Sequence, residues 1–185
     1  MKLIKKELRF SVEKSFGNLY RKQCVLVAVE SDNGNILIGS KPSFYPPGIS
    51  RLLGGGVEEG ETVIDGLVRE VSEELGLELD KSLFEPLALF DVYAKNSEDE
   101  EFHNQTYVYH VKLGKQKYKA GGDVKHILEV TIDQLAELGK SYENLSETLW
   151  YKGNEGTFGW KDYAKMYGPI HSITASLLSS KKLPS

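Results

Sequence analysis

The sequence predicts one domain of the α/β (α+β) class, built around a mixed β-sheet. Its 185 residues suffice for a single domain with a sizeable buried core. Apolar runs of strand character alternate with segments of helical period and with turn signals, the order expected of a mixed sheet covered by helices. Hydrophobic residues make up 40% of the chain and charged residues 27%, a composition typical of an ordered globular protein.

A strand hairpin is predicted near the start of this domain. Residues 24–30 form a nearly continuous apolar run, and residues 36–38 form a second one. Asn33-Gly34 between the runs predicts a tight turn, because such a turn requires positive φ. Cys24, the single cysteine, begins the first run and is predicted to be a small buried hydrophobe.

A loop and a helix follow the hairpin. Residues 41–56 are rich in Pro, Gly and Ser, as a loop is. From Thr62 the apolar period is helical, and it ends at Gly76, a natural helix terminator. The residues predicted to face the core on this helix are Ile64, Leu67, Val68, Val71 and Leu75.

The second half of the chain is predicted to add a longer hairpin, a short strand and two helices. These elements are, in order, strand 83–93, strand 104–113, strand 127–130, helix 132–138 and helix 167–178. Residues 1–19 are predicted to be an N-terminal extension that forms an edge strand or a dimer contact, so a homodimer is one of the options. Residues 179–185 are predicted to be a polar tail.

Composition argues against two classes of partner. The net charge of −4 has the wrong sign for a protein that binds DNA electrostatically. No apolar run approaches the roughly 18 residues that suggest a membrane span. The first ten residues lack the apolar stretch of a signal peptide, and the single cysteine cannot form an internal disulfide. We therefore expect a cytoplasmic protein.

Three glutamates share one face of the predicted helix. At about 100° per residue, Glu70, Glu73 and Glu74 form a stripe beside the core-facing one. Like charges one turn apart repel, and the helix macrodipole disfavours negative charge near the C-terminus. Divalent cations such as Mg²⁺ or Mn²⁺, bound by these carboxylates, would offset the repulsion between them; a solvated acidic face is the alternative. Gly66 lies on the same stripe and is expected to leave open space.

The loop before this helix favours the cation site. Its glycines let backbone groups approach a phosphate closely at the helix start. Glu61 precedes Arg69 by eight residues, a spacing that predicts a salt bridge from loop to helix. Arg69 is also spaced for i,i+4 pairs with Asp65 and Glu73.

Residues 55–77 resemble the Nudix box, the signature of the Nudix hydrolases. That signature is Gly, five residues, Glu, seven residues, Arg-Glu, an aliphatic residue, any residue, Glu-Glu, any residue, Gly and an aliphatic residue. Every defined position is filled, by Gly55, Glu61, Arg69, Glu70, Val71, Glu73, Glu74, Gly76 and Leu77. At average residue usage, the chance of this pattern anywhere in the chain is on the order of one in ten million. The order of elements over residues 20–178 also resembles the family's α/β/α sandwich.

The resemblance implies a pyrophosphohydrolase that cleaves a nucleoside diphosphate linked to another group, X, with Mg²⁺ or Mn²⁺ as cofactor. By position, it makes Glu70 and Glu74 metal ligands, Glu73 a further ligand or the general base, and the Gly55 carbonyl a fourth candidate ligand. Glu61 and Arg69 would hold the loop against the helix, and Gly76 would end the helix. Other candidates for the base are Glu98, Asp99, Glu100, Glu101 and Glu129.

Substrate contacts are harder to assign. Tyr93 lies sixteen residues after the box, near where dinucleoside polyphosphate hydrolases of the family often carry a tyrosine and ADP-ribose hydrolases a proline. The nearest proline, Pro86, is only nine residues after the box, which favours Tyr93 as a residue that stacks on a base; strand packing is the alternative. Phe44 and Tyr45 are candidates for stacking on a base, and Lys41 and Arg51 for contacting phosphates.

Two questions stay open. The aromatic-rich segment 142–167 fits a lid, a dimer interface or a hydrophobic cap over the sheet, of which the cap is favoured. The main alternative function is a catalytically silent nucleotide sensor of the same fold. A regulator of that kind would need a DNA-binding appendage, and the residues after Leu138 carry no basic cluster. An isomerase of prenyl diphosphates is less favoured. That subfamily works with a catalytic cysteine, and the single cysteine here, Cys24, lies in a predicted strand well before the box.

Overall fold

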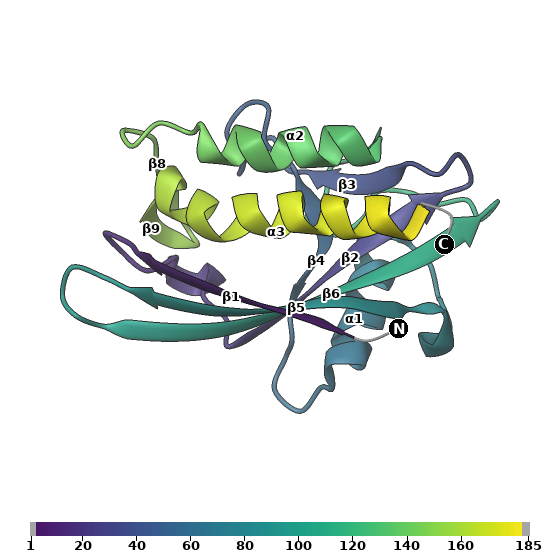
Figure 1. The fold of residues 1–185 in the computed structure, drawn as a ribbon, viewed down its shortest axis with the longest axis horizontal. Coiled ribbons are helices and arrows are strands. Elements are labelled where there is room, and N and C mark those ends of the chain that lie inside the picture. Colours follow the sequence, from purple (N-terminus) through teal and green to yellow (C-terminus); the bar gives the residue numbers. More distant parts are fainter. Residues whose placement is uncertain (1–2, 183–185) are drawn as a thin grey trace.

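A seven-stranded mixed sheet forms the centre of the computed structural model, which describes residues 3–182 (Figure 1). The strand order is β1-β5-β6-β2-β4-β3-β7. Strand pairs β1–β5 and β2–β6 are parallel, and the other pairs are antiparallel. The strands are β1 (Ile4–Ser11), β2 (Gln23–Ser31), β3 (Ile36–Ser40), β4 (Arg51–Gly56), β5 (Glu85–Lys95), β6 (Glu101–Gly114) and β7 (His126–Val130).

Helices cover both faces of the sheet, which confirms the predicted α/β/α sandwich. The helices are α1 (Val63–Leu75), α2 (Ile132–Glu143) and α3 (Trp160–Lys182). Figure 1 shows α1 on one side and the pair α2 and α3 on the other. A small separate sheet, β8 (Trp150–Gly153) with β9 (Gly156–Gly159), precedes α3, and short 3₁₀ turns lie at Gly17–Leu19 and Lys81–Leu83. No helix in the described part of the chain is long and apolar enough to cross a membrane.

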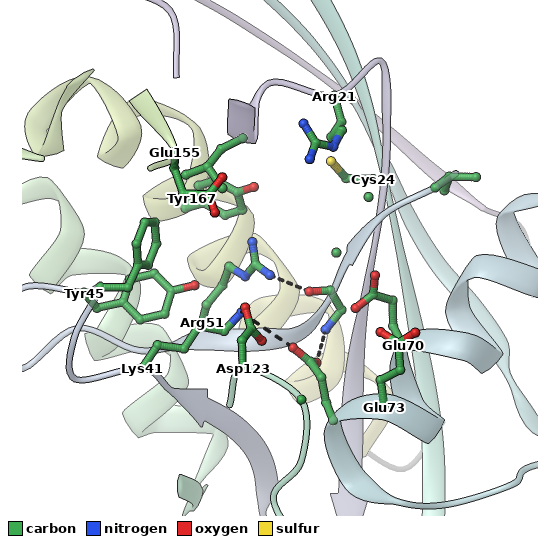
Figure 2. Close-up of a pocket in the computed structure, with 18 of the residues that line it drawn as sticks. Arg21, Cys24, Lys41, Tyr45, Arg51, Glu70, Glu73, Asp123, Glu155 and Tyr167 are labelled. Atoms are coloured by element: carbon green, nitrogen blue, oxygen red, sulfur yellow. Dashed lines mark hydrogen bonds and ion pairs between the residues drawn. The ribbon is translucent and has the colours of Figure 1, made fainter. Parts of the chain in front are cut away.

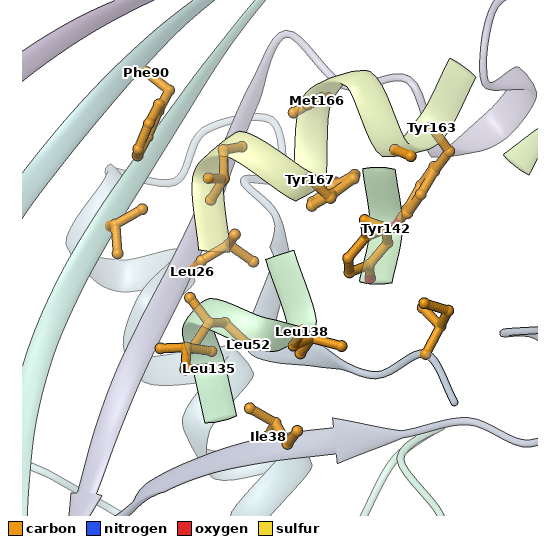
Figure 3. Packing of buried hydrophobic residues seen from close by; sticks show 14 of the residues in the cluster. Leu26, Ile38, Leu52, Phe90, Leu135, Leu138, Tyr142, Tyr163, Met166 and Tyr167 are labelled. Carbon is orange, nitrogen blue, oxygen red and sulfur yellow. The ribbon is translucent and has the colours of Figure 1, made fainter. Parts of the chain in front are cut away.

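Each face of the sheet has its own core. Under α1, buried Leu67, Val71 and Leu75 pack against the valines of β2, as the helical wheel predicted. Under α2 and α3 lies a larger cluster that includes Leu26 and Tyr142 (Figure 3). Strand β2 alternates between the two clusters, and this explains why its sequence is apolar at nearly every position.

Helix α1 begins and ends as its sequence predicts. The Thr62 hydroxyl accepts from the Asp65 N–H at the N-cap, and Gly76 is left-handed at the C-cap, with φ of 66°. The open space expected beside Gly66 is not present. A Cβ there would lie 3.1 Å from a Glu61 carboxylate oxygen, so the missing side chain admits the loop instead.

The hairpins follow the prediction with small shifts at their ends. The turn after β2 contains Gly34, whose φ is 76°. The longer hairpin spans 85–95 and 101–114, so both strands extend further toward the acidic tip than predicted. Of the two options left open for residues 1–19, Ile4–Ser11 takes the edge strand, as β1 beside β5.

The last two helices are longer than their sequences suggested. Helix α2 continues past Leu138 through Gly139, which lies where the helix crosses α3. A Cβ at Gly139 would stand 2.1 Å from the Ser172 hydroxyl. Helix α3 starts at Trp160, seven residues before the predicted start, and runs through Pro169. Of the predicted polar tail, residues 179–182 continue α3, and residues 183–185 lie outside the described residues.

Candidate active site

A cavity of about 970 Å³ lies between helix α1, strand β4 and the start of α3 (Figure 2). One wall is formed by β4, the glycine loop and α1, and we call it the box wall (residues 51–76). The opposite wall is formed by β8, the turn between β8 and β9, and the start of α3, and we call it the aromatic wall (residues 150–167). Leu19, Arg21, Cys24, the loop after β3, and Gly122 and Asp123 before β7 also line the cavity.

Arg69 fastens the loop to the helix. Its guanidinium donates to both carboxylate oxygens of Glu61, at 2.8 and 3.1 Å, and to the Gly56 carbonyl at 2.8 Å. This is the salt bridge that the eight-residue spacing predicted. The hydrogen bonds from Arg69 lower the pKa of Glu61. Of the two i,i+4 partners expected for Arg69, Glu73 is 3.5 Å away, whereas Asp65 pairs with Lys81 instead.

Glu70 lies directly against the glycine loop. A Cβ on Gly55 would lie 2.5 Å from a carboxylate oxygen of Glu70, so only glycine allows this approach. Arg69 donates to the same carboxylate at 2.9 Å. Burial raises the pKa of Glu70, and the Arg69 contact opposes that rise.

Glu74 is the most buried of the three glutamates. It is 3% exposed, and it accepts a 2.7 Å hydrogen bond from the Gly54 N–H. Burial raises the pKa of Glu74 to about 7. The nearest cation is Lys41, whose Nζ lies 3.9 Å from the other carboxylate oxygen.

Glu73 differs from its two neighbours because its side chain is about half exposed at the edge of the cavity. The segment between β6 and β7 folds over this end of α1. Its Lys119 and Gly121 N–H groups donate to the Leu75 and Glu74 carbonyls, at 3.1 Å each. That contact brings Asp123 to the cavity, where it pairs with Lys41 at 2.6 Å.

The donor chemistry here fits a divalent cation. Glu70 and Glu74 come from successive helical turns and flank the Gly55 backbone, which is bare because no Cβ fits there. In residues 3–182, no three carboxylate, histidine or cysteine side chains are gathered closely enough to enclose a metal by themselves. Mg²⁺ usually keeps several waters and takes one or two carboxylates plus substrate phosphates, so two carboxylates and a carbonyl suffice.

Aromatic side chains form the opposite wall. Tyr151, Tyr163 and Tyr167 line the cavity, together with Phe44 and Tyr45 from the loop after β3. Phe158 stacks between Tyr151 and Tyr163, with centroid distances of 5.1 and 5.7 Å. The segment 142–167 thus packs over the sheet and also borders the cavity.

The N-terminal segment holds the aromatic wall in place. The Asn18 N–H donates to the Glu155 carbonyl at 2.8 Å, and the Asn18 side chain donates to the Asn154 carbonyl at 3.0 Å. Gly17 and Gly156 touch at this point, and each has positive φ. Asn154 and Glu155 thereby border the cavity.

Several predicted contacts are brought to the cavity and others are not. Arg51, Phe44, Tyr45 and Lys41 all line it. Tyr93 does not: it lies at the β1–β5–β6 edge, stacked on His103 at 4.4 Å with Arg9 over its other side at 4.3 Å. The strand-packing alternative describes its position.

The other candidate bases lie away from the cavity as well. Glu98, Asp99, Glu100 and Glu101 belong to the tip of the β5–β6 hairpin and its first strand residue. Glu129, in β7, accepts from the Tyr118 and Ser31 hydroxyls at 2.6 and 3.1 Å. Glu73 is therefore the one predicted base that lines the cavity.

Sequence reasoning missed Asp123, Arg21 and the cavity-lining part of the aromatic wall. A signal existed for Asp123: it follows Gly121-Gly122, and a Cβ on Gly121 would lie 2.4 Å from the Glu73 carbonyl. Paired glycines in a polar loop indicate such a close approach. Nothing in the sequence marks which tyrosines reach the cavity.

Comparison with known proteins identifies related chains. The model of the NUDIX domain matches residues 20–149, which is more than half of the chain. An ADP-ribose pyrophosphatase of Methanocaldococcus jannaschii is 32% identical over 117 residues, or 63% of this chain. The match spans 66% of that relative, just under two thirds of its length.

Solved structures show the same fold. The MutT protein of Methanosarcina mazei superposes with a TM-score of 0.53 at 16% identity, over 88% of this chain and 96% of its own. RenU, a Nudix hydrolase of M. smegmatis, gives 0.52 at 14% identity, over 85% and 87%. At these identities the likeness concerns the fold alone.

Proposed function

Since the chain belongs to the NUDIX domain family, we propose that it is a divalent-metal-dependent pyrophosphohydrolase that cleaves a nucleoside diphosphate linked to a group X. The observation that carries this proposal is the box wall. There, Glu70 lies so close to the Gly55 backbone that no Cβ fits, Glu74 accepts from the neighbouring Gly54 N–H, and a separate ion pair between Arg69 and Glu61 holds the loop.

Three residues would hold the cation. Glu70 and Glu74 would bind through their carboxylates, and Gly55 through its carbonyl; Glu73 is a further candidate because it is one turn from Glu70. Mg²⁺ or Mn²⁺ bound there would neutralise phosphate charge and lower the pKa of the attacking water. Glu61 and Arg69 take no part in chemistry and fix the geometry of the loop, and Gly76 ends the helix.

A carboxylate must take the proton from the attacking water. Glu73 and Asp123 both border the cavity and both are exposed enough to be reached by water. They come from different elements, α1 and the segment before β7, so a single substitution in each separates them. We favour Glu73, since it lies on the same helix face as the proposed ligands.

The substrate is a small nucleotide-type molecule. Phe44 and Tyr151 are the half-buried aromatic residues of the cavity, and their rings lie 5.0 Å apart edge to face. A nucleobase placed against them would lie across the cavity from the glutamates. ADP-ribose is the first compound to test, because the curated relative is an ADP-ribose pyrophosphatase. A cytoplasmic location is consistent with such a substrate.

The experiment tests a panel of nucleotides as substrates. It measures the phosphate that is released directly and the phosphate that a phosphatase then releases from the products. The panel holds ADP-ribose, nucleoside triphosphates, dinucleoside polyphosphates, NADH and coenzyme A, each with Mg²⁺, Mn²⁺ or EDTA. We expect turnover of at least one class that EDTA abolishes. Silence across the panel while nucleotides still raise the melting temperature would favour a binding protein and contradict the proposal.

A further inference from the structure

We propose that one end of the cavity, formed by Arg51 with Tyr45, Tyr163 and Tyr167, is a subsite for a phosphoryl group additional to the two that flank the cleaved bond. This inference rests on the proposed function and names the class of X. Figure 2 shows Arg51 between Tyr45 and Tyr167 on one side and Glu70 and Glu73 on the other, with the Tyr45 hydroxyl pointing toward Arg51.

Among the described residues, no carboxylate pairs with the charge of Arg51. Its guanidinium donates to the Gly54 carbonyl, and no ion pair within 4 Å involves it anywhere in residues 3–182. Its Nε is buried without a hydrogen-bond partner. A guanidinium carries five N–H donors, and a buried donor or charge left unsatisfied costs free energy. An anionic ligand would supply the missing acceptors.

The neighbouring tyrosines offer edges to the cavity rather than ring faces. Tyr163 is stacked on Tyr167 at 4.3 Å and on Phe158 at 5.7 Å, so both of its faces are covered. The other face of Tyr167 lies 5.5 Å from the Arg51 guanidinium. Tyr45 packs against Phe44 and Trp160. These rings therefore have no face free for a nucleobase.

Phenol hydroxyls and a guanidinium make a donor-rich surface. Tyrosine O–H can donate, and arginine can only donate. Clusters of donors suit the oxygens of phosphate, and arginine binds phosphate in a bidentate manner. The chemistry of this end of the cavity thus differs from that of the glutamates, which need a cation before they attract phosphate.

The other basic side chains that line the cavity either form ion pairs or are exposed to solvent. Lys41 pairs with Asp123, and Arg69 is bound to Glu61. Arg21 lies at the exposed rim, where solvent satisfies it without cost. Because Arg51 is beyond ion-pair distance of all three glutamates, a phosphoryl group that reaches it is displaced from the metal site toward the tyrosines.

Two kinds of substrate supply such a group. One is a chain of three or more phosphates, as in a nucleoside triphosphate or polyphosphate. The other is a phosphate monoester elsewhere on the molecule, as in coenzyme A. Sugars linked through a simple pyrophosphate have neither. The shared chemistry is a third phosphoryl group, and the experiment has an arm for each source.

The chain arm measures binding without cleavage. Calorimetry in Mg²⁺ compares the α,β-methylene analogues of ADP and ATP. The two analogues differ by one phosphoryl group, and neither can be hydrolysed between its α- and β-phosphates. We expect the triphosphate analogue to bind about ten- to a hundredfold more tightly, the range for charge-assisted hydrogen bonds. Arg51→Gln should reduce this ratio to near one, and Tyr163→Phe should reduce it about threefold.

Arg21→Gln is the matched control, since it removes an arginine from the same cavity; it should preserve the ratio. Arg51→Lys keeps the charge, so it covers the case in which Arg51→Gln does not fold. The monoester arm compares kcat/KM for coenzyme A and 3′-dephospho-coenzyme A. An Arg51-dependent preference in either arm supports the subsite and identifies its source.

The inference and the proposed function can fail separately. If neither arm shows a preference for the compound with the additional phosphoryl group, the subsite is overturned, even if ADP-ribose is hydrolysed. An Arg51→Gln variant that loses the diphosphate and triphosphate analogues equally would also overturn it, because Arg51 would then serve a flanking phosphate. A preserved binding ratio with no turnover of any substrate would contradict the proposed function and leave the subsite standing.

Discussion

The two walls of the cavity are built by different interactions. The box wall is polar, and its contacts join residues close in sequence: Arg69 to Glu61 eight residues away, and Glu74 to Gly54 twenty residues away. The aromatic wall is mainly apolar, and it is fixed by distant contacts, such as that of Asn18 to Asn154, 136 residues away. One wall is a local motif, whereas the other exists only once the chain has folded.

This difference suggests a division of labour. The box wall carries the charges that the proposed chemistry needs, in a geometry that a cation and a phosphate require. The aromatic wall lies after residue 149, where the match to the family model ends. We therefore expect substitutions in the box wall to change kcat and substitutions in the aromatic wall to change KM and substrate choice. The predictions below test that division, beginning with the largest expected effect on turnover and ending with the smallest.

Glu74→Gln should give the largest loss. The substitution keeps the shape and can still accept from the Gly54 N–H, but it removes a proposed metal-binding charge. We expect kcat to fall by several orders of magnitude, with the circular dichroism spectrum unchanged. Glu78→Gln, an exposed glutamate just beyond the end of the same helix, is the control and should keep wild-type turnover.

The same substitution should stabilise the metal-free protein at alkaline pH. Burial raises the pKa of Glu74 to about 7, so ionisation of Glu74 costs stability as the pH rises from 4.5 through 7. At pH 8, Glu74→Gln should raise the free energy of unfolding by on the order of 1–3 kcal/mol, and at pH 4 by little. Urea titrations in EDTA would measure both. Wild-type turnover in Glu74→Gln would refute the proposal that Glu74 binds the metal.

His171 links the walls, and its protonation should weaken that link. Its Nε2 accepts from the Leu52 N–H at 3.1 Å and its Nδ1 donates to the Tyr167 carbonyl at 2.6 Å, so the ring is neutral. Burial lowers the pKa of His171 to about 4. The unfolded chain binds this proton below about pH 6.5, so stability is lost as the pH falls from 6.5 to 4, by at most about 3 kcal/mol.

Urea midpoints at pH 8 and pH 5 would measure this effect. His171→Gln should have a smaller difference between the two midpoints than the wild type, and the exposed His126→Gln should match the wild type. Burial also lowers the pKa of His110, so some acid sensitivity should persist in both variants. If the difference between the two midpoints in His171→Gln equals that of the wild type, protonation of His171 does not contribute to the loss of stability in acid.

The contrast between the walls also explains what the sequence allowed us to predict. Helix α1, its caps and the Glu61–Arg69 pair depend on neighbours within one or two turns, so spacing alone predicts them. The early start of α3 was missed because a proline is favoured in the first turn of a helix, so Pro169 suggested a start just before it, whereas packing against α2 maintains a longer helix with Pro169 in its interior. Tyr151 and Tyr163 reach the cavity through contacts far apart in sequence, and such contacts leave no local pattern.

Glu73→Gln and Asp123→Asn should distinguish the two candidate bases. Loss of a general base typically costs 10²–10⁴-fold in rate. If Glu73 is the base, its variant should lose kcat by that factor with KM nearly unchanged. Asp123→Asn should then lose less than about tenfold, by releasing Lys41. The reverse result would move the base to Asp123 and make the box wall insufficient for the chemistry by itself.

Tyr151→Ala should give the smallest of these effects and the most specific one. Tyr151 lines the cavity with one face packed on Phe158 at 5.1 Å, and removing its ring takes away stacking worth about 1–3 kcal/mol. We expect KM for the preferred nucleotide to rise about tenfold or more with kcat nearly unchanged. Tyr93→Ala, which removes a tyrosine outside the cavity, should leave KM unaltered. If instead Tyr151→Ala lowers kcat at constant KM, then the aromatic wall acts on the transition state, and the two walls share one function rather than dividing it.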